Sequence, residues 1–375
     1  MKLPLRYNLR SLVERKTRTA MTILSIATAI FLSIMMVALS RGLVETTRAT
    51  GSPLNVIVLS QGAESMEFSA IDAEIVHHLQ ALSGQPLVSA QAYISTFVAI
   101  GGVEKRGVVR GLHATTALGI HDNARLLEGR LPNRGFELAV GNLAATKLGV
   151  APSALAIGQA VDFEGQSWTI VGRFEAPNTI LDSELWADVD DILLATKRSD
   201  YSAVMLRTKD AKAAGDILFA LALRTDIRVG ARAEREYYGV KARAMEPLRS
   251  VALVMTLMLV LGGILAGMNT MFTSISGRTR EMGVLLVLGY HRRAVLFSFM
   301  LESLAMCLAG GLVGCTAGLL LNGLPMKIPM GVFRFVVDAQ TLAMAMALAA
   351  FIGIVGALVP VLRVARLSVV AALRD

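Results

Sequence analysis

The stretch SVALVMTLMLVLGGILAGMNTMFTSISG, residues 250–277, contains no charged side chain. It is followed at once by the basic segment RTREMG, residues 278–283, and a second apolar run begins near Ala294. A helix that crosses a membrane needs about 20 mostly apolar residues. This order of apolar run, short basic segment and apolar run is typical of a helical membrane protein.

Two further stretches are long and apolar enough to span a bilayer, one near each end of the chain. We therefore assign spans to residues 19–42, 249–277, 294–322 and 339–362. The composition agrees, because 54% of the 375 residues are hydrophobic and 18% are charged, whereas soluble domains carry about 25% charged residues. Cys307 and Cys315 lie within one apolar run, which excludes a disulfide framework.

Positive charges flank these runs and predict the orientation of the chain. Lys and Arg gather in residues 1–18, 278–293 and 363–375, and cytoplasmic loops carry such an excess. We expect a multi-pass membrane protein with both termini cytoplasmic and with residues 43–248 and 323–338 outside. The net charge is +8, but because the cations abut apolar runs we expect contact with the bilayer and not with nucleic acid.

The first 40 residues allow alternative interpretations. Ala38-Leu39-Ser40 has the small-x-small form of a signal-peptide cleavage site. The long basic segment and the long apolar run favour a retained span instead. Within residues 1–18 the apolar side chains fall on one helical face, which predicts an amphipathic elbow along the inner leaflet. A plain basic flank is the alternative to the elbow.

Residues 43–248 are expected to form a folded domain. Apolar runs around glycine turns predict two hairpins, one turning at Gly101-Gly102 and one at Glu164-Gly165. Further strands are expected at 55–60, 202–208 and 226–231, and helices at 70–82 and 210–224. From Arg232 the pattern turns helical and continues into the second span. The predicted fold is an α-helical membrane protein with four transmembrane helices and a mixed α+β extracytoplasmic domain inserted between spans 1 and 2.

Motifs for catalysis are not found in this sequence. It contains no Gly-x-x-x-x-Gly-Lys-Ser/Thr loop, His-Glu-x-x-His, Cys-x-x-Cys or Gly-x-Ser-x-Gly, so we expect neither an enzyme nor a cofactor or metal in this chain. His77-His78 is interpreted as a surface pair, because adjacent helical residues point about 100° apart. An acidic run lacks the spacing of an EF-hand and is interpreted as a solvated face. Its members are Asp182, Glu184, Asp188, Asp190 and Asp191.

The third span carries small residues and one acid. Gly310, Gly314 and Gly318 repeat every four residues, so they line one face that lets another helix approach closely. That helix could belong to a second protomer or to the same chain. Glu302 lies in the same span, where a carboxylate is costly and usually paired. We favour pairing over a proton relay, because the other three spans contain no acid.

The segment from Ser276 to Glu302 carries a family signature. It contains Arg278-Thr-Arg280-Glu281-Met-Gly283, a Leu288-Gly289 pair and the acid of the following span. This arrangement closely resembles MacB/FtsX-like ABC transporter permeases, although Val287 and Tyr290-His291 depart from the usual residues. Further stretches similar to the family are Asn8–Arg18, Gly129–Gly149, Val171–Trp186 and Val364–Arg374.

The resemblance implies a permease of the bacterial inner membrane that dimerises and works with a separate P-loop ATPase subunit, which binds the ATP. It implies that ATP hydrolysis moves the paired helices and rearranges the outer domain for export or extraction of a substrate. It also admits a periplasmic adaptor of the membrane-fusion type. The residues expected to couple the permease to the ATPase are Arg278, Arg280, Glu281, Gly283 and Gly289. The alternative is that these charges pair with lipid headgroups.

Two other functions stay open. One is an FtsX-like signalling or division subunit that activates an extracytoplasmic partner without transport. The other is a membrane-anchored sensor or enzyme that has no ATPase. The size of the outer domain favours transport over the division role.

Overall fold

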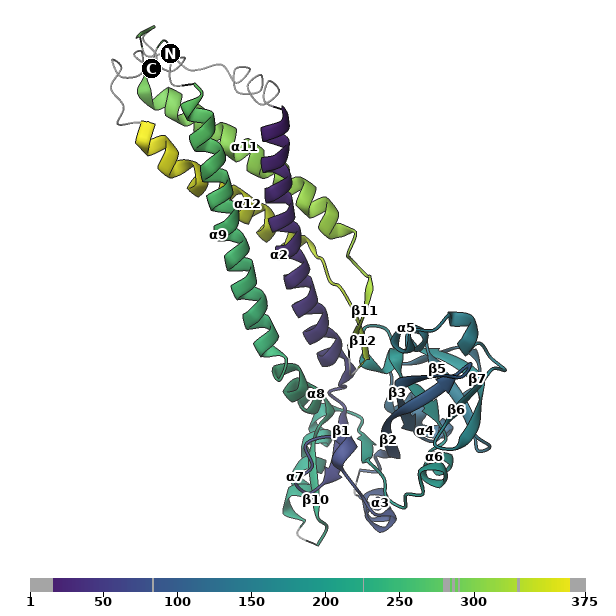
Figure 1. The fold of residues 1–375 in the computed structure, drawn as a ribbon. Coiled ribbons are helices and arrows are strands. Elements are labelled where there is room, and N and C mark those ends of the chain that lie inside the picture. The colour runs from purple at the N-terminus through teal and green to yellow at the C-terminus, as the bar shows by residue number, and fades with distance from the viewer. Residues whose placement is uncertain are drawn as a thin grey trace. The chain divides into compact units, whose positions relative to one another are not determined.

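The computed structural model describes residues 16–82, 84–224, 226–278, 284, 287–288, 291–328 and 331–364. The chain folds into two compact units (Figure 1). The first, here called the membrane unit, comprises residues 1–41, 247–324 and 335–375. The second, here called the large domain, comprises residues 42–246 together with 325–334.

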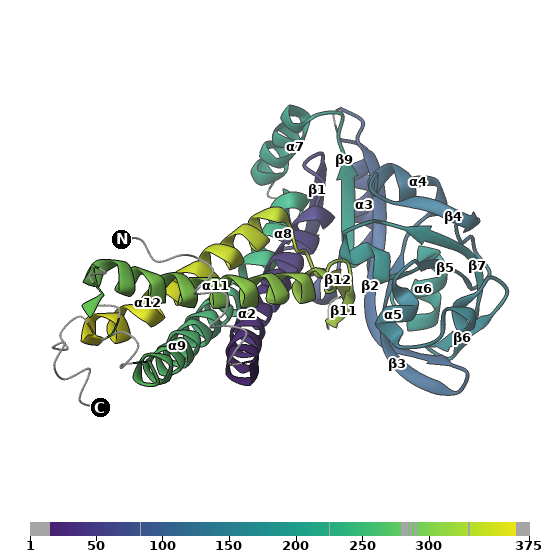
Figure 2. The ribbon, with the colours of Figure 1, turned by 90° about the horizontal axis from the view of Figure 1, so that it is seen from above.

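Four helices in the described residues are long and apolar enough to cross a membrane, which confirms the predicted fold class. They are α2 (Lys16–Thr50), α9 (Glu246–Ser276), α11 (Arg292–Leu319) and α12 (Ala339–Val364). In the membrane unit, isoleucines of α2 pack with Cys307 and Cys315 of α11 and with Ala349 and Ile352 of α12. Figures 1 and 2 show α11 and α12 running beside each other.

Helix α2 continues past the predicted end of the first span at residue 42. The extra turns contain threonines, which lower helix propensity. Thr47 Oγ1 donates to the Leu43 carbonyl at 2.8 Å, and Thr50 Oγ1 donates to the Thr46 carbonyl at 2.9 Å. Since these hydroxyls bond within the helix, the polar end of α2 stays helical inside the large domain.

The large domain is built on a mixed sheet with the strand order β10-β1-β9-β2-β3-β8-β5-β7-β4, and β6 pairs with β2 and β7. Its strands are β1 (Asn55–Ser60), β2 (Leu87–Ile100), β3 (Val103–Gly111), β4 (Arg125–Gly129), β5 (Glu137–Gly141), β6 (Ala160–Phe163), β7 (Gln166–Glu175), β8 (Leu185–Ala187), β9 (Ala203–Arg207) and β10 (Val229–Ala233). The long strand β2 joins two halves, because its first part pairs with β9 and its second part with β3.

Short helices and turns cover this sheet, and each half has its own apolar core. The helices are α3 (Ala73–Gln80), α4 (Ala114–Ile120), α5 (Ala144–Leu148), α6 (Val189–Thr196), α7 (Ala211–Leu223) and α8 (Glu234–Arg243). The 3-10 turns are η1 (Met66–Phe68), η2 (Pro152–Leu155) and η3 (Ile180–Ser183). Strand β10 runs to Ala233, past the residue where the sequence pattern predicted a helix to begin, because it pairs with β1 along its whole length.

Both predicted hairpins are present as β2–β3 and β6–β7, with positive φ angles at Gly101, Gly102, Glu164 and Gly165. The segment expected to be a short outer loop contains a third hairpin. Its strands are β11 (Pro325–Ile328) and β12 (Gly331–Arg334), and this hairpin belongs to the large domain.

Candidate functional site

A buried ion pair links the end of α9 to α11. Arg278 lies two residues after the end of α9 at Ser276, and its Nη1 donates to Glu302 Oε2 at 3.1 Å. Both side chains are only 6% exposed. Removing either partner would leave a charge without water, which is strongly unfavourable in a membrane protein. The acid of the third span is therefore paired, and Arg278 is directed inward to α11.

The other residues expected to couple the chain to an ATPase are Arg280, Glu281, Gly283 and Gly289. They lie outside the described residues. Their role stays a prediction from the sequence.

The glycine face of α11 is filled by α2 of the same chain. A Cβ atom on Gly310 would lie 2.9 Å from the Ile23 carbonyl oxygen, and one on Gly314 would lie 2.7 Å from that of Ala27. On Gly318 it would lie 2.9 Å from Ile34 Cγ2. Contacts this short exclude any side chain at these positions without movement of α2. Of the two neighbours that the sequence allowed, the structure selects the internal one.

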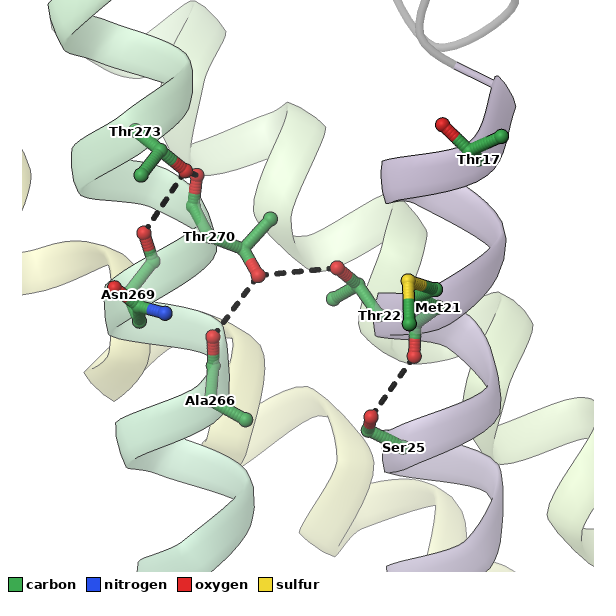
Figure 3. Close-up of a pocket in the computed structure, with 8 residues that line it drawn as sticks. All are labelled: Thr17, Met21, Thr22, Ser25, Ala266, Asn269, Thr270 and Thr273. Carbon is green, nitrogen blue, oxygen red and sulfur yellow. Dashed lines mark hydrogen bonds between the residues drawn. The ribbon is translucent and has the colours of Figure 1, made fainter.

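A polar cleft lies between α2 and α9 within the membrane unit (Figure 3). It has a volume of about 540 Å³ and is lined by Thr17, Met21, Thr22, Ser25, Ala266, Asn269, Thr270 and Thr273. Thr22 Oγ1 and Thr270 Oγ1 lie 3.0 Å apart and form a hydrogen bond between the helices. None of the lining residues that the structure describes carries a charge. Sequence reasoning missed it, although Thr22 and Ser25 on one run, and Asn269 and Thr273 on another, follow helical spacing.

The interpretation of the acidic run as a solvated face is wrong. Four of its members are buried, namely Asp182, Glu184, Asp188 and Asp191. Each has a structural partner in the fold. Glu184 accepts two hydrogen bonds from Arg110, both at 2.7 Å, and Asp191 accepts from the backbone N–H groups of Gly135 and Phe136 at 2.8 Å. Burial raises the pKa of Asp182.

One trio in the described part of the chain has ligand atoms close enough to hold a metal ion, namely His113, Asp188 and Asp190, all within 4.8 Å of one another. These groups already have partners. Asp188 lies 3.4 Å from His113 Nδ1, which raises the pKa of the histidine, and Asp190 pairs with Arg134. His77 and His78 are exposed on α3, as their surface interpretation requires.

Comparison with known proteins covers most of the chain. Residues 19–222 match the MacB-like periplasmic core domain, and residues 253–369 match the FtsX-like permease C-terminal region. The macrolide export ATP-binding/permease protein MacB of Campylobacter jejuni is 24% identical over 97% of this chain and 60% of its own length. MacB of Acinetobacter baylyi is 32% identical over 33% of this chain and 18% of its own length.

The chain thus spans about 60% or less of the length of these curated relatives. The periplasmic region of MacB from Actinobacillus actinomycetemcomitans superposes with a TM-score of 0.40 at 12% identity, over 54% of this chain and 97% of that one. The match to the core domain alone covers more than half of the chain. The predicted family is confirmed: the chain belongs to the MacB/FtsX-like ABC transporter permeases.

Proposed function

We propose that this permease couples ATP hydrolysis by a separate P-loop ATPase subunit to movement of the large domain, and that this movement exports or extracts a substrate. The family supports a multi-pass permease of the inner membrane as the component that the chain provides. The proposal assigns the ATP to a P-loop ATPase subunit that works with the permease. A second permease protomer completes the proposed complex, and a periplasmic membrane-fusion adaptor is a further candidate partner.

One observation carries the proposal, namely the continuity of the helices. Helix α2 is a single helix whose first turns belong to the membrane unit and whose last turns belong to the large domain. Residues 234–276 form α8 and α9, which a turn at Ala244-Met245 joins, and α9 leads to the segment after Ser276. A helix resists axial compression because every turn is hydrogen-bonded to the next. Movement of the segment after α9 would therefore be conveyed along α9.

The proposal places the segment 278–293 and both termini in the cytoplasm, because Lys and Arg gather there. Single cysteines at Ser199 and Ser368, in a background without Cys307 and Cys315, test this. An impermeant thiol reagent applied to intact cells should label Ser199→Cys and leave Ser368→Cys unlabelled. Labelling of both would overturn the four-span orientation.

The coupling role is tested by Glu281→Lys, with Asp375→Lys as the control that adds the same charge to the C-terminal tail. If Glu281 contacts the ATPase, charge reversal places like charges at an interface, which costs about 2–5 kcal/mol when a buried pair is lost. The variant should insert normally but lose the co-purified ATPase, whereas the control should keep it. Full ATPase binding and activity in Glu281→Lys would show that this charge only meets lipid headgroups.

The alternatives give different outcomes in the same preparation. A sensor or enzyme without an ATPase would co-purify with none even as the wild type. An FtsX-like signalling subunit would bind the ATPase and lose activation of its extracytoplasmic partner, with no transported substrate.

A further inference from the structure

The connection between α11 and α12 is a paired ribbon and not a single-chain loop. Strands β11 and β12 pair from Pro325↔Arg334 to Ile328↔Gly331. The pairing continues beyond them, because the Phe335 N–H donates to the Leu324 carbonyl at 3.1 Å and the Gly323 N–H donates to the Phe335 carbonyl at 2.9 Å. Two hydrogen-bonded strands bend less easily than one chain. We call residues 323–328 and 331–335 the ribbon.

The far part of the ribbon is built into the large domain. Val332 and Phe333 are each 1% exposed. A Cβ atom on Gly331 would lie 2.9 Å from Ser183 Oγ and 3.4 Å from Ile180 Cβ, so β12 runs directly against η3. Lys147 Nζ at the end of α5 donates to the Ile328 carbonyl. These contacts hold the ribbon from two sides.

The same turn receives the end of α2. All four residues of η3 are buried, and the Ile180 N–H donates to Thr50 Oγ1 at 3.1 Å. A Cβ atom on Gly42 would lie 2.3 Å from the Arg334 carbonyl oxygen, so α2 and the ribbon also meet at close range. Within the large domain, η3 is thus the place where two chain segments arriving from the transmembrane helices converge.

The residues that flank the ribbon on both sides are held within the membrane unit. The Val337 N–H donates to Asn322 Oδ1 at 3.0 Å. Asp338 accepts the Thr341 N–H at 2.8 Å at the start of α12, and it pairs with Arg41 of α2 at 3.0 Å. Side chains of the membrane unit therefore hold the residues that flank the ribbon, and side chains of the large domain hold its strands.

We propose that the ribbon is a third coupling path, beside α2 and α8–α9, which conveys movement of α11 and α12 to the η3 turn, with Gly331 and Lys147 as its positioning residues. This inference rests on the proposed function, since it needs an ATP-driven movement of the helices. The ribbon stays docked on η3 throughout the cycle and moves with the large domain. Its length and its docking are both required.

The test uses a slack variant, which lengthens the connections of the ribbon to α11 and α12 without removing the contact between β12 and η3. Gly-Ser-Gly-Ser is inserted after Leu324 and again after Arg334, and the control carries the same insertion between Gly101 and Gly102 in the exposed β2–β3 turn. Spin labels on Ser199→Cys and Thr316→Cys, in a background with Cys307→Ala and Cys315→Ala, report the distance between the large domain and α11. The full complex with its ATPase is measured without nucleotide and with ATP plus vanadate.

The wild type and the control should show a nucleotide-dependent change in this distance. The slack variant should still bind the ATPase and hydrolyse ATP. Its nucleotide-dependent change in label-to-label distance, which measures the coupling, should be about tenfold smaller than in the wild type, a factor within the range of known coupling energies. Gly331→Val, which forces β12 from η3 at unchanged length, should give the same loss. Movement in both variants equal to that of the wild type would overturn the inference while leaving the proposed function intact. No movement in the wild type would overturn both.

A separate experiment checks that the ribbon still contacts η3 in the slack variant, so that a loss of coupling caused by misfolding is not attributed to the added residues. Ser183→Cys with Gly331→Cys should form a disulfide in the slack variant, and Trp168 and Trp186 emission should match the wild type. In the otherwise unchanged chain this disulfide should leave coupling unaltered. Loss of coupling on its formation would show that the ribbon must undock, which contradicts a path that stays attached.

Discussion

The large domain and the membrane unit each bury a charged pair, but the contacts around that pair differ. In the large domain a complete cation is buried, because Arg110 is 1% exposed and bonds Glu184 and Gln91. Trp186 Nε1 adds a bond to the same carboxylate at 3.2 Å. In the membrane unit Arg278 and Glu302 are buried as a pair, and the helices around them pack through isoleucine, alanine, cysteine and glycine. Ser33 and Thr270 each donate a hydroxyl to a carbonyl of their own helix.

The difference follows from the surroundings of each unit. Water drives the large domain to bury large aromatic side chains, and Trp168, Trp186 and Phe174 are all fully buried there. Lipid gives helices no such drive, so their association depends on close van der Waals contact at small residues and on a few hydrogen bonds. Substitutions in the two units should therefore fail for different reasons and by different amounts.

The largest effect is expected at Arg110. Arg110→Met leaves Glu184 buried without its cation, which should destabilise the large domain by about 3–5 kcal/mol. Chemical unfolding followed by tryptophan emission reports this domain, because both tryptophans of the chain lie in it. The control is Arg125→Met, whose pair with Glu175 leaves the arginine 75% exposed and should be worth less than about 1 kcal/mol. Equal losses of unfolding free energy in the two variants would mean that the buried pair of Arg110 and Glu184 stabilises the domain no more than an exposed pair does.

A pH-dependent effect is expected at Glu234, at the start of α8. Its Oε2 accepts the Ser52 N–H and Asn55 Nδ2, both at 2.9 Å, and burial raises its pKa to about 7. The folded state therefore holds the proton more tightly than the unfolded state. Stability from this group is complete below the unfolded pKa of 4.5 and is lost as the pH rises through 7.

The expected loss between pH 5 and pH 8 is up to about 3 kcal/mol. Glu234→Gln keeps the acceptor oxygen and has no charge to form, so its stability should fall less over the same interval. Unfolding midpoints of the full-length protein, read by tryptophan emission at each pH, give the comparison. Parallel pH curves for the two proteins would show that this carboxyl does not titrate in the interval.

The membrane unit should respond to added volume. Gly314→Leu pushes a side chain against the Ala27 carbonyl and Ile30, and overpacking of this kind costs about 1–3 kcal/mol. Gly262→Leu is the matched control, because a Cβ atom there meets no atom within 4 Å. Thermal stability in detergent should fall for Gly314→Leu and stay near the wild type for Gly262→Leu. If Gly314→Leu reduced the oligomer size but left the stability of the protomer unchanged, the glycine face would pack against a second protomer and not against α2 of the same chain.

Local signals in the sequence explain which predictions succeeded. The four spans are visible as long uncharged runs, and the two predicted turns have positive φ angles that Gly101, Gly102 and Gly165 adopt readily. The interpretation of the acidic run as a solvated face was wrong because the burial of a residue depends on partners that are distant in the sequence. Glu184 meets Arg110, which lies 74 residues away in the sequence, so no window around the acid could have contained its partner.

The docked ribbon could not be predicted for a similar reason. Its strands are short, and β11 is largely exposed. Only the fold brings Gly331 against η3, about 150 residues earlier in the chain. Gly314 was recognised from its spacing, but the choice between α2 and a second protomer needed the three-dimensional contact.

The smallest expected effect concerns the bond between α2 and α9. Thr22 and Thr270 share a 3.0 Å hydrogen bond across the polar cleft, and Thr270 Oγ1 also bonds the Ala266 carbonyl at 3.0 Å. Because the Thr270 hydroxyl also bonds a carbonyl of its own helix, it keeps a partner when the bond to Thr22 is lost. Interhelical bonds of this kind average about 0.6 kcal/mol in double-mutant cycles. The cycle of Thr22→Val, Thr270→Val and the double variant, measured by reversible unfolding in mixed micelles, should give a coupling of that size. A coupling free energy above about 2 kcal/mol would exceed the largest values known for such bonds. It would mean that this hydrogen bond stabilises the position of α2 as much as its packing on the glycine face of α11 does.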